Sequence, residues 1–260
     1  MLDKFPPEYQ ISELNKSLLF KYFSKDIGVY PDEIDQTKSF FGHSTKSMVI
    51  NPQSNNLWAG EILKINLQES SFLNFATNAA ILLNLRTLRA KLKMSSEKPF
   101  FPNIYKTGIF NGKPAVIEEY IPNARGVDNF DLLLQLGLAH SKNFVLNTLS
   151  GLAKLQFNGV IQIDTLLPNF AYMPEDHTNT LIDFGTAYSE QTKTWTNLAS
   201  SPEEAVVKGV FNFSAEMTRL FSGLKSTKIE KFFQKVNYNS RQYTSYTTLL
   251  KEFENQQNTN

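Results

Sequence analysis

One stretch of the chain gathers residue types that can hold a metal ion or move a proton. Asp164 is followed five residues later by Asn169, and Asp183-Phe184-Gly185 comes downstream. Carboxylate and amide oxygens are ligands for Mg²⁺, and a carboxylate can also act as a general base. Each of these residues taken alone is an ordinary turn residue. Their order, after a helix predicted to end at Leu155, favours a functional role over a turn.

This order resembles the catalytic loop and metal-binding motif of the protein kinase-like superfamily. The resemblance implies ATP and Mg²⁺ as cofactors. It implies that Asp164 orients the acceptor hydroxyl and takes its proton, while Asn169 and Asp183 are metal ligands. The resemblance extends from about Gly42 to Gly223. It favours the eukaryotic-like branch of the superfamily over the aminoglycoside phosphotransferase branch. In its small size the chain also resembles compact bacterial effector and toxin kinases.

The segment Gly42-His43-Ser44-Thr45-Lys46-Ser47-Met48-Val49 resembles the glycine-rich phosphate loop of that family. Gly42 stands at the first glycine position, and Ser44 and Ser47 replace the other two. Small residues still let backbone amides approach a triphosphate. By itself the segment also fits an ordinary hairpin turn. Lys64, fifteen residues after Val49, matches the catalytic strand lysine that grips the α and β phosphates, which strengthens the phosphate interpretation.

A second strand segment, Ala115-Val116-Ile117-Glu118-Glu119-Tyr120-Ile121, resembles the hinge that joins the two lobes of a kinase. The resemblance implies that backbone groups of Glu119 and Ile121 meet the adenine ring. It also places Glu118 at the gatekeeper position, where a carboxylate is unusual.

Several residues depart from the family pattern. Gln162 and Ile163 replace the His and Arg that precede the catalytic Asp, and Leu166 replaces a Lys common in serine/threonine kinases. Asn78 stands where a helix Glu pairs with the strand lysine, and an amide supplies no counter-charge. Glu69 is a possible substitute. These departures keep open a nucleotide-binding pseudokinase that acts as an interaction module.

The predicted elements around these motifs indicate an α+β, two-lobed fold with a β-rich N-lobe and a reduced helical C-lobe. We expect an N-terminal helical extension over residues 1–35, the N-lobe over 36–121 and the truncated C-lobe over 122–260. Apolar residues spaced by three and four predict a long helix over residues 71–93. Asn111-Gly112 predicts a hairpin turn between two strands. Residues around Pro168 are expected to be irregular, followed by a strand at 180–182.

The composition limits the class of protein. Lys and Arg total 26 against 25 Asp and Glu, which argues against nucleic acid as the main partner. The absence of cysteine excludes disulfides and thiolate metal sites. No segment resembles a signal peptide or a transmembrane span. We therefore expect a soluble protein, either cytoplasmic or exported into a host cytosol without a classical signal peptide.

We interpret the basic cluster and the histidines of this chain as structural residues and not as a binding site. The basic cluster of Arg86, Arg89, Lys91 and Lys93 ends the long predicted helix, and we expect it to complement the helix dipole and face water. A site for an anionic ligand or a headgroup is the alternative. His43, His140 and His177 are far apart in the sequence, which argues against a histidine metal site.

The predicted function is ATP- and Mg²⁺-dependent transfer of a phosphoryl group to a hydroxyl of a protein substrate. The alternatives are the pseudokinase module, AMP transfer and small-molecule phosphorylation. Because Ile163 cannot receive a phosphate, we expect activity to be independent of activation-segment phosphorylation and to be controlled by a partner or ligand that orders the helix around Asn78. The candidate hydroxyls of that segment are Thr186, Tyr188, Ser189, Thr192, Thr194 and Thr196.

Overall fold

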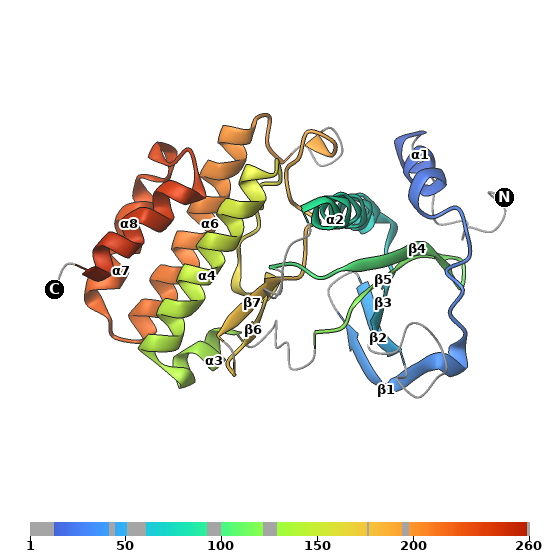
Figure 1. Cartoon of the computed structure of the whole chain (residues 1–260), viewed down its shortest axis with the longest axis horizontal. Coiled ribbons are helices and arrows are strands. Elements are labelled where there is room, and N and C mark those ends of the chain that lie inside the picture. The colour runs from blue at the N-terminus through green and yellow to red at the C-terminus, as the bar shows by residue number, and fades with distance from the viewer. Residues whose placement is uncertain are drawn as a thin grey trace. The chain divides into compact units, whose positions relative to one another are not determined.

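The computed structural model describes residues 13–41, 45–50, 61–92, 100–121, 129–175, 177–193 and 198–258 (Figure 1). The chain forms two compact units. Unit 1 comprises Met1–Ser95 with Pro102–Pro122, and unit 2 comprises Ser96–Phe101 with Asn123–Asn260. The described residues form helices and antiparallel sheets, so the expected α+β class agrees with the structure.

Unit 1 is built on a five-stranded antiparallel sheet in the order β1-β2-β3-β5-β4. The strands are β1 (Ile34–Phe41), β2 (Thr45–Ile50), β3 (Glu61–Asn66), β4 (Ile104–Phe110) and β5 (Lys113–Glu119). Asn111 and Gly112 connect β4 to β5 with φ angles of 48° and 79°. These left-handed angles are the ones that a type I′ hairpin turn requires, which confirms the predicted Asn-Gly turn.

The helix α2 (Phe72–Leu92) packs in unit 1 together with α1 (Glu13–Tyr22). The predicted long helix is present, but residues 75–82 are all buried, so the middle of α2 is covered on every side rather than along a single stripe. Phe23, which follows α1, contacts the rings of Phe72 and Phe75 at centroid distances of 5.9 and 5.8 Å. The segment after α1 also bridges the sheet, since Asp26 pairs with Ile109.

Arg86, in the basic cluster at the end of α2, is exposed, as expected, and also makes contacts that the sequence analysis did not foresee. Its guanidinium donates to the backbone carbonyls of Ile104 and Tyr105, at 3.1 and 2.9 Å. The side chain therefore ties α2 to β4 instead of only facing water. The side chains of Arg89, Lys91 and Lys93 lie outside the described part of the chain.

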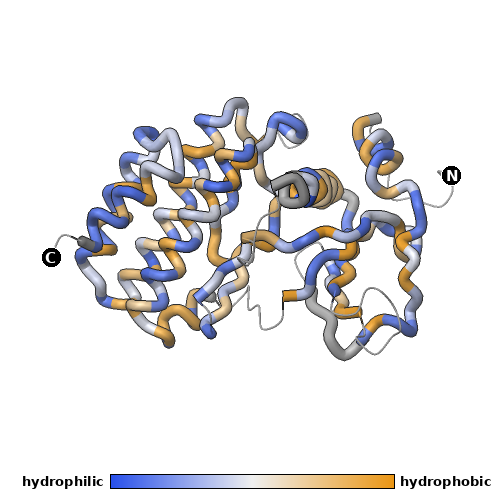
Figure 2. Tube along the Cα trace, viewed as in Figure 1, coloured by the Kyte–Doolittle hydropathy of each residue, from blue (hydrophilic) through white to orange (hydrophobic). Residues whose placement is uncertain are grey.

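Unit 2 is mainly helical. Its helices are α3 (Asn129–Leu136), α4 (Leu138–Phe157), α6 (Pro202–Gly223), α7 (Thr227–Tyr238) and α8 (Tyr246–Asn258). Figure 2 shows apolar and polar stretches alternating along these helices, as expected for elements with one buried face. The stacked rings of Phe221 and Phe233 lie at the α6–α7 contact, with a centroid distance of 5.8 Å. No helix among the described residues is long and apolar enough to cross a membrane.

A two-stranded hairpin of β6 (Phe170–Met173) and β7 (Thr178–Leu181) completes unit 2. The sequence analysis was wrong in treating the residues after Pro168 as irregular throughout. Phe170, Ala171 and Tyr172 are fully buried and pair with β7, so a short apolar run forms a strand once its partner is present.

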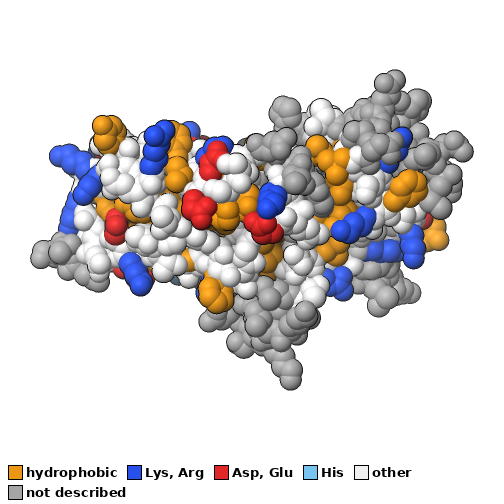
Figure 3. Space-filling model, turned by 90° about the horizontal axis from the view of Figure 1, so that it is seen from above, with side chains coloured by type: hydrophobic (Ala, Val, Ile, Leu, Met, Phe, Trp, Pro, Cys, Tyr) orange, Lys and Arg blue, Asp and Glu red, His pale blue; other side chains and the backbone are white. Residues whose placement is uncertain are grey.

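The described charges are mixed on the face seen in Figure 3. Basic side chains there form separate small groups, with acidic side chains between some of them. This distribution is what the near balance of 26 basic and 25 acidic residues leads one to expect.

Glu61, at the start of β3, is an acidic residue that is only 7% exposed. Its Oε2 atom has no hydrogen-bond partner among the described residues, and burial raises the pKa of Glu61 from 4.5 to about 7. The folded state therefore holds the proton more tightly than the unfolded chain. Glu61 consequently makes folding less favourable as the pH rises from about 4.5 to about 7.

We expect Glu61→Gln to raise the Tm at about pH 8 and to leave it nearly unchanged at about pH 3.5, where the native carboxyl is neutral in both states. Calorimetric unfolding of both proteins at the two pH values measures this. An equal shift at both pH values would show that a cause other than the Glu61 charge is responsible.

Candidate functional site

The segments that carry Asp164 and Asp183 are joined at two places in unit 2. After α4, Ile161 exchanges backbone hydrogen bonds with Tyr188, at 2.9 and 2.7 Å. At the open end of the β6–β7 hairpin, the N–H of Ile182 donates to the carbonyl of Asn169 at 2.9 Å. These bonds hold the stretch before β6 beside the stretch after β7, although the two are far apart in the sequence.

Gln162 links the backbones of the two aspartates directly. Its side chain is fully buried, and its Nε2 donates to the carbonyl of Asp183 at 2.7 Å and to that of Asp164 at 3.3 Å. The hydroxyl of Tyr246 in turn donates to the carbonyl of Gln162 at 2.6 Å. The sequence analysis named Gln162 only as a departure from the family pattern. The structure gives it a definite role in positioning both aspartates.

The backbone around Asp164 is also fixed by α6. Asn212 donates from its Nδ2 to the carbonyl of Ile163 at 2.8 Å, and the Thr165 hydroxyl donates to the carbonyl of Gly209 at 2.7 Å. A side chain at Gly209 would collide with Tyr246, which explains the glycine. The residue before Asp164 and the residue after it are thus held by hydrogen bonds, which limits the movement of its carboxylate.

Asp164, Asn169 and Asp183 lie together, as the sequence order predicts. Asn169 donates from Nδ2 to the carbonyl of Asp164 at 2.8 Å. Burial raises the pKa of Asp164, the hydrogen bond from the Asn169 side chain lowers it, and the negative charge of Asp183 raises it. The net shift is upward. A carboxylate with a raised pKa is a stronger base than an ordinary exposed aspartate.

Asp183 is exposed and keeps a fixed orientation. Its Oδ1 accepts a hydrogen bond from the backbone N–H of Gly185 at 2.7 Å. The neighbouring Phe184 is fully buried and meets Phe101 edge to face at 6.5 Å. The buried ring anchors the chain while the carboxylate beside it stays accessible to a ligand.

The donor set of Asn169 and Asp183 fits Mg²⁺. Because the Nδ2 of Asn169 is directed at Asp164, the atom it offers to a cation is the carbonyl Oδ1, a hard oxygen ligand. Within the part of the chain that the structure describes, no three His, Cys, Asp or Glu side chains form a metal cluster. An incomplete oxygen set is typical of Mg²⁺ that is also bound by substrate phosphates.

Unit 1 contains a second arrangement of predicted site residues. The Nζ of Lys64 on β3 lies 2.5 Å from the Oε2 of Glu118 on β5, and Glu118 is only 1% exposed. Asn78 on α2 donates from Nδ2 to the Oε1 of Glu118 at 3.0 Å. Glu118 therefore lies between the lysine and the helix.

This arrangement corrects the sequence analysis on the counter-charge of Lys64. The carboxylate comes from Glu118 on the neighbouring strand, and Asn78 supports it by a hydrogen bond. The side chain of Glu69, the substitute considered from the sequence, is outside the described residues. The alternation of side chains along strands could have pointed to Glu118, because Lys64 pairs with Val116, two residues before Glu118 on the same face.

The other predicted nucleotide contacts are described only in part. Gly42 and Ser44 lie outside the described residues, whereas Ser47 lies directly opposite Lys64 in the β2–β3 pairing. The N–H of Glu119 donates to the carbonyl of Asn103 at 2.8 Å, so an adenine contact at Glu119 would have to use another group. Ile121 is half-buried.

Two of the three histidines meet in space, contrary to what their sequence separation suggests. The rings of His140 and His177 have centroids 4.6 Å apart, and the hydroxyl of Tyr172 lies 3.0 and 3.5 Å from their Nδ1 atoms. His43 is outside the described residues.

Three of the candidate activation hydroxyls are buried. Tyr188, Ser189 and Thr192 are 4%, 6% and 0% exposed, and the hydroxyls of Ser189 and Thr192 are 2.9 Å apart. Lys193, which could meet a phosphate, already pairs with Glu190 at 2.6 Å. Thr194 and Thr196 are outside the described residues, and Thr186 is half-buried.

We expect activity to survive removal of phosphate from this segment, because a modifying enzyme would first have to unfold the buried hydroxyls. Initial rates measured before and after phosphatase treatment, with intact mass as the control for phosphate content, should agree within about threefold, the scale of an exposed ion pair worth under about 1 kcal/mol. A hundredfold loss, reversed when one site is phosphorylated again, would contradict this.

In comparisons with known proteins, the chain matches no protein-family model and no curated protein sequence.

Proposed function

We propose that this chain is a kinase-like phosphotransferase that uses ATP and Mg²⁺ to phosphorylate a hydroxyl group on a protein. The observation that carries the proposal is the cluster of Asp164, Asn169 and Asp183, whose backbones Gln162 and the β6–β7 hairpin hold together. A proton acceptor beside two oxygen ligands for Mg²⁺ is the constellation that phosphoryl transfer needs.

In this proposal Asp164 orients the acceptor hydroxyl and receives its proton. The hydroxyl oxygen forms a bond to the γ-phosphorus, the bond from that phosphorus to the β–γ bridging oxygen breaks, and ADP leaves with the electron pair. Asn169 and Asp183 hold Mg²⁺, which neutralises phosphate charge when it is bound. In unit 1, Lys64, which Glu118 orients, is the residue that we propose for binding nucleotide phosphates.

The pairing of Lys64 with Glu118 favours an enzyme over an inert module. Loss of the helix carboxylate at Asn78 is the main sequence argument for a pseudokinase. Because Glu118 provides a buried carboxylate within 2.5 Å of Lys64, that loss is compensated within unit 1.

ATP labelled at the γ or the α phosphate tests the proposal, with casein and the chain itself as acceptors and Asp164→Asn as the control. We expect label from γ-labelled ATP in protein, in the native chain only. Label from α-labelled ATP would indicate AMP transfer instead. A further outcome is that the chain binds ATP saturably and transfers neither label to any acceptor, water and small hydroxyl compounds included. That result would indicate a nucleotide-binding pseudokinase.

Metal removal tests the roles of Asn169 and Asp183. We expect ATP to bind at least tenfold more weakly after chelation of Mg²⁺, and Asp183→Ala to weaken Mg²⁺–ATP binding by a similar factor, since about 1.4 kcal/mol of lost metal contact accounts for it. Calorimetric titration with and without metal measures both. Equal affinity under the two conditions would contradict the metal-ligand roles.

A further inference from the structure

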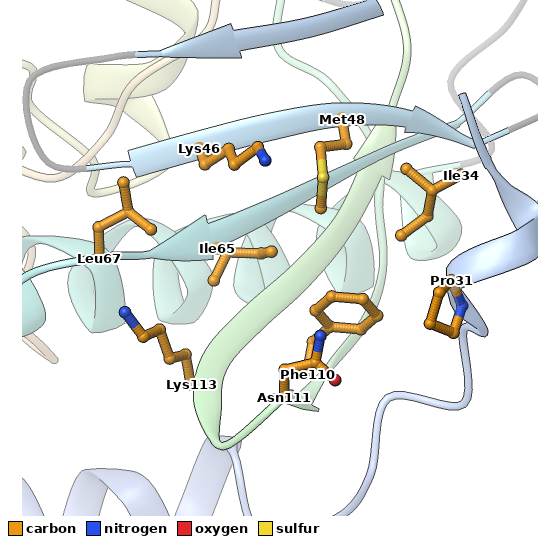
Figure 4. Close-up of a pocket in the computed structure, with 9 residues that line it drawn as sticks. All are labelled: Pro31, Ile34, Lys46, Met48, Ile65, Leu67, Phe110, Asn111 and Lys113. Atoms are coloured by element: carbon orange, nitrogen blue, oxygen red, sulfur yellow. The ribbon is translucent and has the colours of Figure 1, made fainter. Parts of the chain in front are cut away.

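Unit 1 has a pocket on the sheet face opposite Lys64. Side chains alternate between the two faces of a strand, so Ile65 points away from the face that carries Lys64 and Glu118. The pocket has a volume of 370 Å³, within the range of small-molecule sites. Figure 4 shows its lining residues, which come from β1, β2, β3, the β4–β5 hairpin and Pro31 before β1.

The pocket combines an apolar surface with two ammonium groups. Ile34, Met48, Ile65 and Phe110 belong to one buried apolar cluster, and all four line the pocket. Lys46 and Lys113 line it as well, and the nine lining residues within the described part of the chain include no acidic one.

The strand register explains why the two lysines share this pocket. Lys46 pairs with Ile65, which in turn pairs with Ala115 on β5. Lys113 lies two residues before Ala115 and therefore points to the same face. The two lysines thus flank β3 from either side. In Figure 4 both lie on the Leu67 side of the pocket, and Pro31, Ile34 and Phe110 lie on the other side.

We propose that this pocket binds a single-chain amphiphilic anion of the fatty-acid class. Its carboxylate lies beside Lys46 and Lys113, and its acyl chain covers Met48, Ile65 and Phe110. Such a ligand matches both the ammonium groups and the mainly apolar lining of the site, whereas a cation would meet like charges. This site is separate from the nucleotide chemistry and does not depend on it.

The test is calorimetric titration of the full chain with hexanoate, octanoate and decanoate below their micelle concentrations. Each further buried methylene should tighten binding about fourfold. Decan-1-ol, which has the same chain without the charge, should bind at least tenfold more weakly than decanoate. We expect Lys113→Gln alone, and with Lys46→Gln, to weaken decanoate binding about tenfold or more.

Lys25→Gln is the matched control, since it removes one exposed lysine of unit 1 that does not line the pocket. It should leave the affinity for decanoate unchanged. Vesicles of anionic phospholipid distinguish a free acid from a lipid surface. Binding to vesicles without binding to decanoate, equal affinity for decan-1-ol, absence of a chain-length effect, or unchanged affinity in folded lysine variants would each overturn the proposal.

Discussion

Asp164→Asn is expected to slow phosphoryl transfer about 10³-fold while leaving ATP binding and the fold intact, because a positioned general base contributes about 10²–10⁴-fold to such reactions. Asn keeps the shape of the side chain and can still accept a hydrogen bond. It cannot take up the proton of the acceptor hydroxyl. The carbonyl of residue 164, which accepts from Asn169 and Gln162, is unaffected by the change.

The stability of the same variant should differ little from that of the native chain or be slightly higher near neutral pH. Burial raises the pKa of Asp164 in the folded protein. Folding therefore becomes less favourable as the pH rises above the pKa that Asp164 has in the unfolded chain, and Asn removes the charge that causes this. Initial rates at saturating ATP, ATP titration and thermal unfolding measure the three properties.

Acidification should reduce the native rate when Asp164 becomes protonated. Because its pKa is raised in the folded protein, this loss should begin at a higher pH than for an ordinary aspartate. A folded Asp164→Asn variant that retains a tenth of the native rate would show that another group accepts the proton.

Local patterns in the sequence predict much of the fold. The Asn111-Gly112 turn is set by residues that tolerate left-handed angles, and the helix α2 by its apolar spacing of three and four. The chain order of Asp164, Asn169 and Asp183 was enough to predict that they lie close together. Strand β6 was missed because a run as short as Phe170–Met173 becomes a strand only through its pairing with β7.

Interactions that depend on register or on tertiary folding could not be read from the sequence. Gln162 acquires its role only when the hairpin brings Asp183 beside Asp164. His140 and His177 meet because α4, which carries His140, packs on β7, which follows His177. No local pattern in the sequence encodes this packing. The family resemblance led us to expect the acidic partner of Lys64 on the long helix. In the structure the partner is Glu118, which the register of β3 and β5 places on the same face of the sheet.

Lys64→Met is expected to reduce phosphoryl transfer about 10²–10³-fold, the cost of removing one group that stabilises charge in a transition state. The structure adds a second effect, which the sequence alone did not suggest. Glu118 is 1% exposed, so the variant leaves a buried carboxylate without the ammonium group beside it. Breaking a buried ion pair costs about 3–5 kcal/mol of stability, and the 19% exposure of Lys64 places the loss toward the lower end.

Adding Glu118→Gln to Lys64→Met separates the two effects. The amide oxygen that it introduces can still accept the hydrogen bond from Asn78, and no buried charge remains. We therefore expect the double variant to recover most of the lost stability and none of the lost transfer. Thermal unfolding and initial rates are measured on both variants. Glu61→Gln, alone and added to Lys64→Met, is the matched control, and it should change stability by the same amount in both backgrounds. Glu61 is also a buried glutamate of this sheet, whereas the ion pair that Lys64 makes at 2.5 Å is with Glu118.

Each outcome of this experiment decides one role. A Lys64→Met variant as stable as the native chain would mean that Glu118 does not depend on the lysine charge. Near-normal transfer in the folded single variant would mean that another cation binds the phosphates. Recovery of transfer in the double variant would mean that Lys64 serves only to neutralise Glu118. Loss of transfer in both variants, with Glu118→Gln restoring more stability to Lys64→Met than the Glu61→Gln control adds, is the result that the geometry of Lys64, Glu118 and Asn78 leads us to expect.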